Sequence, residues 1–200
     1  MERRADVRGW IAVMGSGQVD SQHPVYVRAA RCGELLARHG WGIVTGGYFG
    51  VMEAAARSAR AQGGRVRSVP CREFRRNAIH PYADEVIWTD QYEDRIRTLC
   101  GIADGYFILL GGIGTMAELF YVWSIAQVRY PRHLPVVLVG PEWSDVLVSW
   151  RTHLLIPERD WQLIVWTPSP EEAVEWLESW SQQQNPPKSS PTQEAHDEQT

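Results

Sequence analysis

Two ionisable residues flank a glycine-rich turn in the second half of this sequence. Glu118 follows Thr115 by three positions, and Arg95 precedes the turn. A carboxylate and a guanidinium that converge on a phosphate pocket suit glycosidic cleavage. The carboxylate would stabilise an oxocarbenium-like transition state or orient the attacking water, and the cation would hold the phosphate or the departing base. Arg95 and Glu118 are therefore the candidate catalytic pair.

Each member of this pair also has a purely structural interpretation. Thr115 and Glu118 have the spacing of a capping box, in which the glutamate serves only the start of a helix. Arg95 has acidic neighbours, Glu93 and Asp94, and a surface ion pair with one of them is a common arrangement. The spacing alone leaves these alternatives open.

Three glycine-bearing turns each lead from an apolar run toward a helical pattern. They are Gly15-Ser16-Gly17, Gly46-Gly47-Tyr48-Phe49-Gly50 and Gly111-Gly112-Ile113-Gly114-Thr115. Glycine lets the backbone approach a bulky anion, and the free N–H groups of the following helix point at it. We predict a phosphate cradle made by Gly111, Gly112, Gly114 and Thr115. We predict nucleotide contacts from Gly15, Ser16, Gly46, Gly47 and Gly50. Close packing is the alternative for the first two turns.

These turns do not follow the common nucleotide-binding fingerprints. The first turn lacks the third glycine of GxGxxG, and the run Thr45-Gly46-Gly47 lacks the acid that would hold a ribose hydroxyl. No GxxxxGK[ST] motif occurs in the sequence either. A hydride-transfer enzyme and a P-loop NTPase are therefore disfavoured.

Apolar runs alternate with helical patterns along the chain. Strands are predicted at residues 10–14, 41–45, 65–69, 85–89, 106–110, 134–139 and 162–166. Helices are predicted at residues 24–39, 50–62, 92–103, 115–128, 143–155 and 171–180. Alternation of this kind with continuous apolar strands is typical of a parallel sheet covered on both faces. The predicted fold is α/β: a Rossmann-like, doubly wound, mostly parallel sheet with helices on both faces.

The composition changes near the C-terminus. Residues 1–181 are predicted to form one nucleotide-binding domain. Residues 182–200 are rich in Gln, Pro, Ser, Thr and acids, and they contain no large apolar residue. Such a segment cannot bury enough surface to offset its ordering entropy, so a disordered polar tail is predicted.

Charge and cysteine usage exclude several classes of protein. The net charge of −4 does not suggest a nucleic-acid or membrane partner. No apolar run reaches the length of a membrane span, and no secretory signal is visible, so a cytoplasmic location is expected. The three cysteines have no CxxC pair and are expected to be buried free thiols. The scattered histidines lack ligand spacing, and no metal or other cofactor is predicted.

The positive charge is unevenly distributed. Seven arginines fall within one short stretch: Arg57, Arg60, Arg65, Arg67, Arg72, Arg75 and Arg76. The stretch is either a solvated face or a positive rim that attracts an anionic small molecule.

The motifs around the third glycine turn resemble a known family. The run from Leu110 to Glu118, LGGIGTMAE, is similar to the PGGxGTxxE motif of the LOG proteins, the cytokinin-activating phosphoribohydrolases often misannotated as lysine decarboxylases. The stretch 94–104 matches the family's ERKxxM…AD spacing, 46–52 resembles its GGGxxGLM turn, and Gly15-Ser16 resembles its GSS turn. The resemblance runs from about Trp10 to Glu178.

This resemblance implies a function for the candidate site. The family hydrolyses N6-modified adenosine 5′-monophosphate to the free base and ribose 5-phosphate. By position, Arg95 and Glu118 become its catalytic pair, and the glycine turn becomes its phosphate cradle. A homodimer with the active site near the interface is also implied. Lysine decarboxylase activity is rejected because Lys188, in the tail, is the only lysine.

Departures from the family motifs keep a second function open. Leu110 replaces the motif proline, Ile96 replaces the lysine after the arginine, and Asp94 replaces the glutamate before it. Relatives that diverge in this way include proteins resembling molybdenum-cofactor carriers. The alternative is therefore a non-enzymatic carrier or sensor for a nucleotide or a phosphorylated pterin.

The helix predicted after the third turn bears on the oligomeric state. Between Leu119 and Val128 its residues are apolar nearly all round. A helix of this kind is buried on more than one face, either in the core or in a contact between two subunits.

Overall fold

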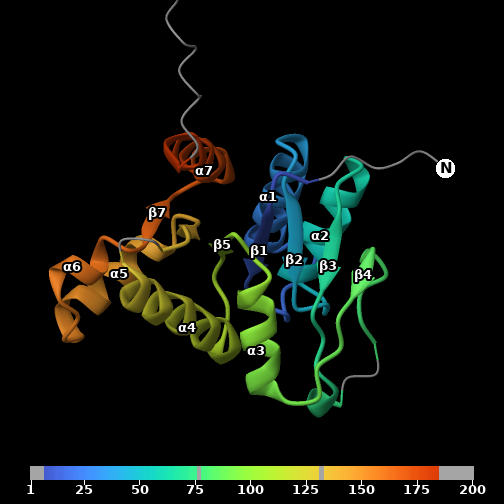
Figure 1. Cartoon of the computed structure of the whole chain (residues 1–200), viewed down its shortest axis with the longest axis horizontal. Helices are drawn as coiled ribbons and strands as arrows, with labels where there is room; N and C mark the ends of the chain where they lie inside the picture. Colours follow the sequence, from blue (N-terminus) through green and yellow to red (C-terminus); the bar gives the residue numbers. More distant parts are fainter. Residues whose placement is uncertain (1–6, 76–77, 131–132, 185–200) are drawn as a thin grey trace, which may run out of the picture.

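Seven parallel strands pair side by side in one sheet of the computed structural model, which describes residues 7–75, 78–130 and 133–184. Their order is β4-β3-β2-β1-β5-β6-β7. The strands are β1 (Trp10–Met14), β2 (Gly42–Thr45), β3 (Val66–Ser68), β4 (Glu85–Val86), β5 (Gly105–Ile108), β6 (Val136–Val139) and β7 (Val165–Thr167). The predicted α/β, doubly wound parallel sheet is confirmed (Figure 1).

Helices connect these strands. They are α1 (Pro24–Arg38), α2 (Val51–Ala61), the 3-10 helix η1 (Arg72–Phe74), α3 (Tyr92–Gly101), α4 (Ile113–Arg129), α5 (Trp143–His153), α6 (Glu158–Trp161) and α7 (Pro170–Gln184). No helix within the described residues combines the length and the apolar character needed to cross a lipid bilayer.

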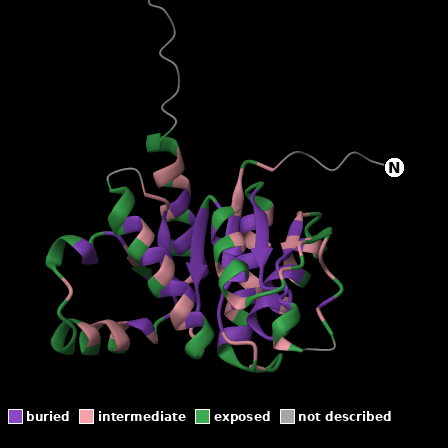
Figure 2. Cartoon of the chain, turned by 60° about the horizontal axis from the view of Figure 1, so that its bottom comes forward, coloured by how far each residue is buried: buried purple, intermediate pink, exposed green. Residues whose placement is uncertain are grey.

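The side chains of each strand alternate between two cores, because successive residues of a strand point to opposite faces. Ile11 and Val13 of β1 pack in the core beneath α1, α2 and α7. Ala12 and Met14 of the same strand pack in the core beneath α3, α4 and α5. Helices therefore cover both faces of the sheet, as predicted. Figure 2 shows the central strands buried between helices whose outer faces are exposed, whereas the edge strand β4 is exposed.

Several element boundaries differ from the sequence prediction, and three of the differences change how a predicted segment is interpreted. Helix α4 begins at Ile113, before Thr115. Strand β7 begins at Val165, because Leu163 instead packs with Trp123 and Trp161 in a third cluster after the unpredicted helix α6. Helix α7 continues through residues 182–184, so these three do not belong to a disordered tail. The rest of the predicted tail, residues 185–200, lies outside the described residues.

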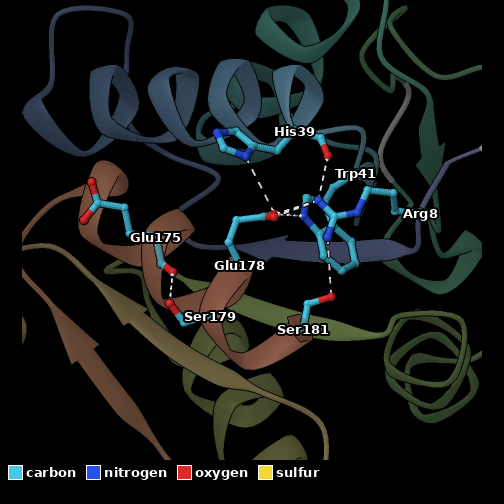
Figure 3. A network of polar contacts seen from close by, with 7 residues as sticks. All are labelled: Arg8, His39, Trp41, Glu175, Glu178, Ser179 and Ser181. Atoms are coloured by element: carbon cyan, nitrogen blue, oxygen red, sulfur yellow. Dashed lines mark hydrogen bonds and ion pairs between the residues drawn. The ribbon is translucent and has the colours of Figure 1, made fainter. Parts of the chain in front are cut away.

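A polar network ties the last helix to the start of the domain (Figure 3). The carboxylate of Glu178 on α7 accepts hydrogen bonds from Arg8 at 2.8 Å and from the indole of Trp41 at 2.8 Å. The His39 ring lies 3.7 Å from the same carboxylate. Burial opposes the charge of Glu178, but the bonds from Arg8 and Trp41 outweigh it and lower the pKa of this carboxyl. The network therefore anchors α7 over the sheet.

The order of the strands places a crevice between β1 and β5. From β1 the chain builds outward through β2, β3 and β4, and it then returns to the other side of β1 as β5. The loops that leave β1 and β5 therefore diverge to opposite faces. In open α/β sheets, ligands bind beyond the carboxyl ends of strands at such a switch point.

Candidate active site

The first and third glycine turns meet at the switch point. The backbone N–H of Ser16, after β1, donates to the carbonyl of Leu110, after β5, at 3.0 Å. A Cβ on Gly111 would collide with the Thr115 hydroxyl and would reach 2.8 Å from the Ser16 nitrogen. Position 111 therefore requires glycine, because the two turns approach each other too closely for a side chain.

Helix α4 presents free backbone N–H groups to this crevice. Gly112 is its N-cap and supplies no side-chain cap, and a Cβ at Gly112 or Gly114 would meet open space. An uncapped helix start favours an anion, since its N–H groups and the helix dipole both attract negative charge. Phosphate binding by this turn stays a prediction.

The second glycine turn packs against the first glycine turn and against Arg95. Gly50 has a φ of 66°, and the next N–H, that of Val51, donates to the Ser16 carbonyl at 2.9 Å. A Cβ on Gly46 would collide with the guanidinium of Arg95. Gly46, Gly47 and Gly50 do not line the cavity described below, so contacts from them to a nucleotide stay a prediction.

Arg95 and Glu118 meet in the crevice. Arg95 Nη1 donates to Glu118 Oε1 at 2.7 Å, and both side chains are over nine-tenths buried. Arg95 Nε also donates to the carbonyl of Val69, after β3, at 3.1 Å. The guanidinium is therefore held in one orientation by a partner on each side, as a site that works by positioning requires.

Both structural alternatives for this pair are wrong. Because α4 begins at Ile113, Thr115 lies inside the first turn and Glu118 in the second, so the two residues do not form a capping box. Asp94 lies 3.8 Å from Arg97 instead. The partner of Arg95 is Glu118, which lies on another helix.

A cavity of about 270 Å³ contains these elements. The turns after β1 and β5 contribute Gly15, Ser16, Gly17, Gln18, Gly112, Gly114 and Thr115. The remaining lining residues are Tyr48, Met52, Phe74, Tyr92, Arg95 and Glu118. The structure thus brings the candidate pair and most of the predicted turn residues together at one cavity.

Sequence reasoning missed the aromatic part of this cavity. The ring centroid of Phe74 lies 5.8 Å from that of Tyr48 and 5.4 Å from that of Tyr92. Burial, followed by the charge of Glu118, raises the pKa of the Tyr92 hydroxyl. The three rings come from separate segments, and no spacing in the sequence pointed to their meeting.

A buried polar cluster beneath the second turn was also missed. His80 Nε2 lies 3.1 Å from the Thr45 hydroxyl and 3.3 Å from the Ser68 hydroxyl. The Thr45 hydroxyl accepts from the backbone N–H of Gly47 at 3.2 Å, and the backbone N–H of His80 donates to the Gly47 carbonyl at 2.9 Å. Burial lowers the pKa of His80 to about 4. A neutral histidine therefore clamps the Gly47 turn next to Arg95.

The arginine-rich stretch does not line the cavity. Arg60 pairs with Asp84, Arg67 with Glu85, and Arg72 with Asp90. These ion pairs belong to the surface around β3 and β4, which favours the interpretation of a solvated face. Arg76 lies outside the described residues.

Cysteine nucleophiles and a clustered metal site find no support in the described part of the chain. All three cysteines are buried and free, as predicted. Burial raises the pKa of Cys32 and of Cys100 to about 12, so these thiols stay protonated at neutral pH. Residues 7–75, 78–130 and 133–184 contain no group of three His, Cys, Asp or Glu side chains placed to hold a metal ion.

Comparison with known protein families shows which family matches the residues of this site. The model of the SLOG cluster4 family matches residues 8–129, which include β1 through α4 and every residue of the cavity. The chain belongs to the SLOG cluster4 family. The resemblance to the LOG proteins inferred from the glycine motifs is thereby confirmed.

Relatives of this SLOG protein have names that describe nucleotide chemistry. It is 32% identical over 160 residues to a Mycobacterium tuberculosis protein named cytokinin riboside 5′-monophosphate phosphoribohydrolase, covering 78% of this chain and 84% of the relative. It is 30% identical over 129 residues to an Escherichia coli pyrimidine/purine nucleotide 5′-monophosphate nucleosidase, covering 60% of this chain and 28% of that relative.

A solved structure with the same fold has a different description. A molybdenum cofactor binding protein from Rippkaea orientalis superposes with a TM-score of 0.70 at 22% identity, covering 88% of this SLOG protein and 99% of that chain. At this identity the likeness establishes the shared fold alone.

Proposed function

We propose that this SLOG protein hydrolyses the N-glycosidic bond of a nucleoside 5′-monophosphate, AMP or an N6-modified AMP, to the free base and ribose 5-phosphate. The observation that carries the proposal is the buried Arg95–Glu118 pair, 2.7 Å apart, beside the open N-terminus of α4. The names of the mycobacterial and Escherichia coli relatives support the same class of reaction.

Each part of the cavity has a role in this reaction. The free N–H groups at the start of α4 and the Thr115 hydroxyl bind the phosphate. Glu118 supplies negative charge next to C1′, where positive charge develops in the oxocarbenium-like transition state, or it orients the attacking water. The water oxygen bonds to C1′, and the base leaves with the electron pair of the broken C–N bond and one proton from that water.

Arg95 positions the carboxylate and adds a cation to the site. Its bonds to Glu118 and to the Val69 carbonyl fix the guanidinium between β3 and α4. From there its positive charge stabilises the bound phosphate, or the negative charge that develops on the leaving base. No cofactor is required by this scheme, because water is the only co-reactant.

Base release measured by chromatography tests the proposal. Wild type, Glu118→Gln and Glu158→Gln are each incubated with AMP and with N6-isopentenyl-AMP. Glu158 is the matched control because its ion pair with Arg151 is exposed and lies outside the cavity. We expect release by wild type and by the control, and a loss of roughly 100-fold or more in Glu118→Gln. Absence of release from wild type, or unchanged release by Glu118→Gln, would refute the proposal.

A binding protein without turnover is the second candidate. Ile96 stands where the family motif has a lysine, and its side chain packs on the core of the α3–α5 face. Arg95 is therefore the only cationic side chain among the described residues that line the cavity. A single cation leaves less stabilisation for the negative charge that develops on a leaving base, which is the observation that favours binding without cleavage. AMP that raises the melting temperature without any base release would favour this carrier or sensor.

We further propose that two copies associate through α4. Its inner face is buried, whereas Phe120 and Val128 are 40% and 79% exposed. Leu155 nearby is fully exposed, and it lines with Phe120 a hollow of about 260 Å³. Exposed apolar surface of this kind is typical of an interaction site. A second copy suits it because the family resemblance implies a homodimer.

A further inference from the structure

The aromatic side of the cavity is built from three elements that meet only in the fold. Tyr48 follows β2, Phe74 ends η1, and Tyr92 begins α3. The ring centroid of Phe74 lies 5.8 Å from that of Tyr48 and 5.4 Å from that of Tyr92, so it contacts both rings. All three line the cavity that also contains the phosphate cradle. Two tyrosines thus hold the ring of Phe74.

The backbone around these rings is anchored independently of any ligand. The Tyr48 hydroxyl donates to the Cys71 carbonyl at 3.0 Å and accepts from the Cys71 N–H at 2.9 Å. The Glu73 carboxylate accepts from the N–H of Tyr92 at 2.8 Å, which ties η1 to the start of α3. Phe74 is therefore preorganised, and a ligand that stacks on it would not have to order the loop.

The spatial order of the cavity relates these rings to the reacting pair. The guanidinium carbon of Arg95 lies 5.5 Å from the ring centroid of Phe74, and its Nη1 lies 2.7 Å from Glu118 Oε1. Glu118 belongs to α4, the helix whose start forms the predicted cradle. A nucleotide with its phosphate on α4 and its C1′ at Glu118 can place its base against the rings of Phe74 and Tyr92, which line the same cavity.

We propose that Phe74, braced by Tyr48 and Tyr92, is the stacking surface for the heterocyclic base and makes the site selective for purine over pyrimidine nucleoside monophosphates. Base–aromatic stacking contributes about 1–3 kcal/mol per base and grows with the overlapping area, which favours the bicyclic purine. The cavity of about 270 Å³ is near the small end of the range for ligand pockets, which is consistent with one mononucleotide. The inference uses the phosphate position of the proposed function but does not depend on turnover.

Binding of ligands that cannot be hydrolysed separates this inference from catalysis. Formycin 5′-monophosphate and pseudouridine 5′-monophosphate have a carbon–carbon glycosidic bond, and they carry a purine-like and a pyrimidine base. Ribose 5-phosphate has no base. Calorimetry with all three ligands is carried out on wild type, Phe74→Ala, Phe74→Leu and Phe74→Trp. Phe49→Ala is the matched control, because Phe49 is 42% exposed in the Tyr48 turn and does not line the cavity.

We expect wild type to bind the formycin nucleotide more tightly than the pseudouridine nucleotide. Phe74→Ala and Phe74→Leu should lose about 5- to 150-fold in affinity for the formycin nucleotide and less than twofold for ribose 5-phosphate. Phe74→Trp and Phe49→Ala should retain affinity for both. Phe74→Leu preserves apolar volume, so it tests the ring even where the alanine variant does not fold.

Two results would overturn the stacking surface. One is an equal loss for the formycin nucleotide and for ribose 5-phosphate, and the other is no loss in either Phe74→Ala or Phe74→Leu. A wild type that binds none of the three ligands would overturn the phosphate site together with the stacking surface. Base-selective binding without base release would instead overturn the proposed hydrolysis and leave the stacking surface in place.

Discussion

The guanidinium of Arg95 occupies the space into which a Cβ on Gly46 would project. Gly46 lies at the end of β2 and Arg95 on α3, so the close approach of these two elements sets the position of the catalytic candidate. Arg95 is then held from the other side by Glu118 on α4 and by the carbonyl of Val69. The absence of a side chain at position 46 is therefore part of the site.

Gly46→Ala should impair the site more than it impairs the fold. The added methyl displaces the buried guanidinium and strains the packing, which destabilises by roughly 1–3 kcal/mol. We expect base release from AMP to fall at least tenfold. Gly101→Ala is the control, since no atom lies within 4 Å of its Cβ position. Equal base release by the two variants would show that activity does not depend on the observed position of Arg95.

His80 should make stability depend on pH above its own pKa of about 4. In the unfolded chain a histidine titrates near 6.5, so the unfolded state binds more protons between pH 6.5 and 4 and stability falls as the pH falls through that range. Between pH 7 and pH 5 the free energy of unfolding should fall by about 2 kcal/mol, as measured by urea unfolding.

His80→Gln isolates this effect from other groups. The glutamine amide can still donate to the Thr45 and Ser68 hydroxyls but does not titrate. The variant should therefore lose less stability than wild type between pH 7 and pH 5. Parallel pH profiles for the two proteins would mean that His80 is not buried in its neutral form.

Glu178 should contribute stability that disappears at acidic pH. Its pKa in the folded state is lowered, so its stabilisation is complete above the ordinary glutamate value of about 4.3 and is lost as the pH falls through the lowered value. Glu178→Gln should lower the melting temperature at pH 7 and should flatten the fall in stability below about pH 4.5. Glu175→Gln on the same helix serves as the control for the charge change.

The proposed subunit contact can be tested by charge insertion. Val128→Asp and Leu155→Asp should convert a dimer to monomers in light-scattering measurements, because each places a carboxylate on the exposed apolar surface of α4 and its neighbours. Val27→Asp is the matched control, since Val27 is 56% exposed on the distant helix α1. A monomeric wild type would exclude this contact.

The cysteines should be unreactive in the folded protein. Burial raises the pKa of Cys32 and of Cys100 to about 12. Cys71 is only 1% exposed. A thiol reagent such as dithionitrobenzoate should therefore react slowly at pH 8 and should titrate all three thiols only after unfolding in urea. Fast reaction of one thiol without denaturant would contradict the observed burial.

The sequence by itself determined the fold class and the position of the candidate catalytic groups along the chain. Apolar runs separated by helical patterns are local signals, and they were sufficient to predict the parallel sheet and the sequence of strands and turns along the chain, although several strand ends lie elsewhere. The three glycine turns follow from the same pattern, because each ends a strand. The LGGIGTMAE run then identified the family.

Only the tertiary structure decided which residues meet. Spacing offered Thr115 or the acidic neighbours of Arg95 as partners, whereas the packing of α3 against α4 joins Arg95 to Glu118. The rings of Tyr48, Phe74 and Tyr92, and the clamp of His80, also come from segments far apart in the chain. Periodicity reports which face of an element is buried, but a contact between elements depends on strand order and helix placement. The aromatic side of the cavity therefore had no signature in the sequence.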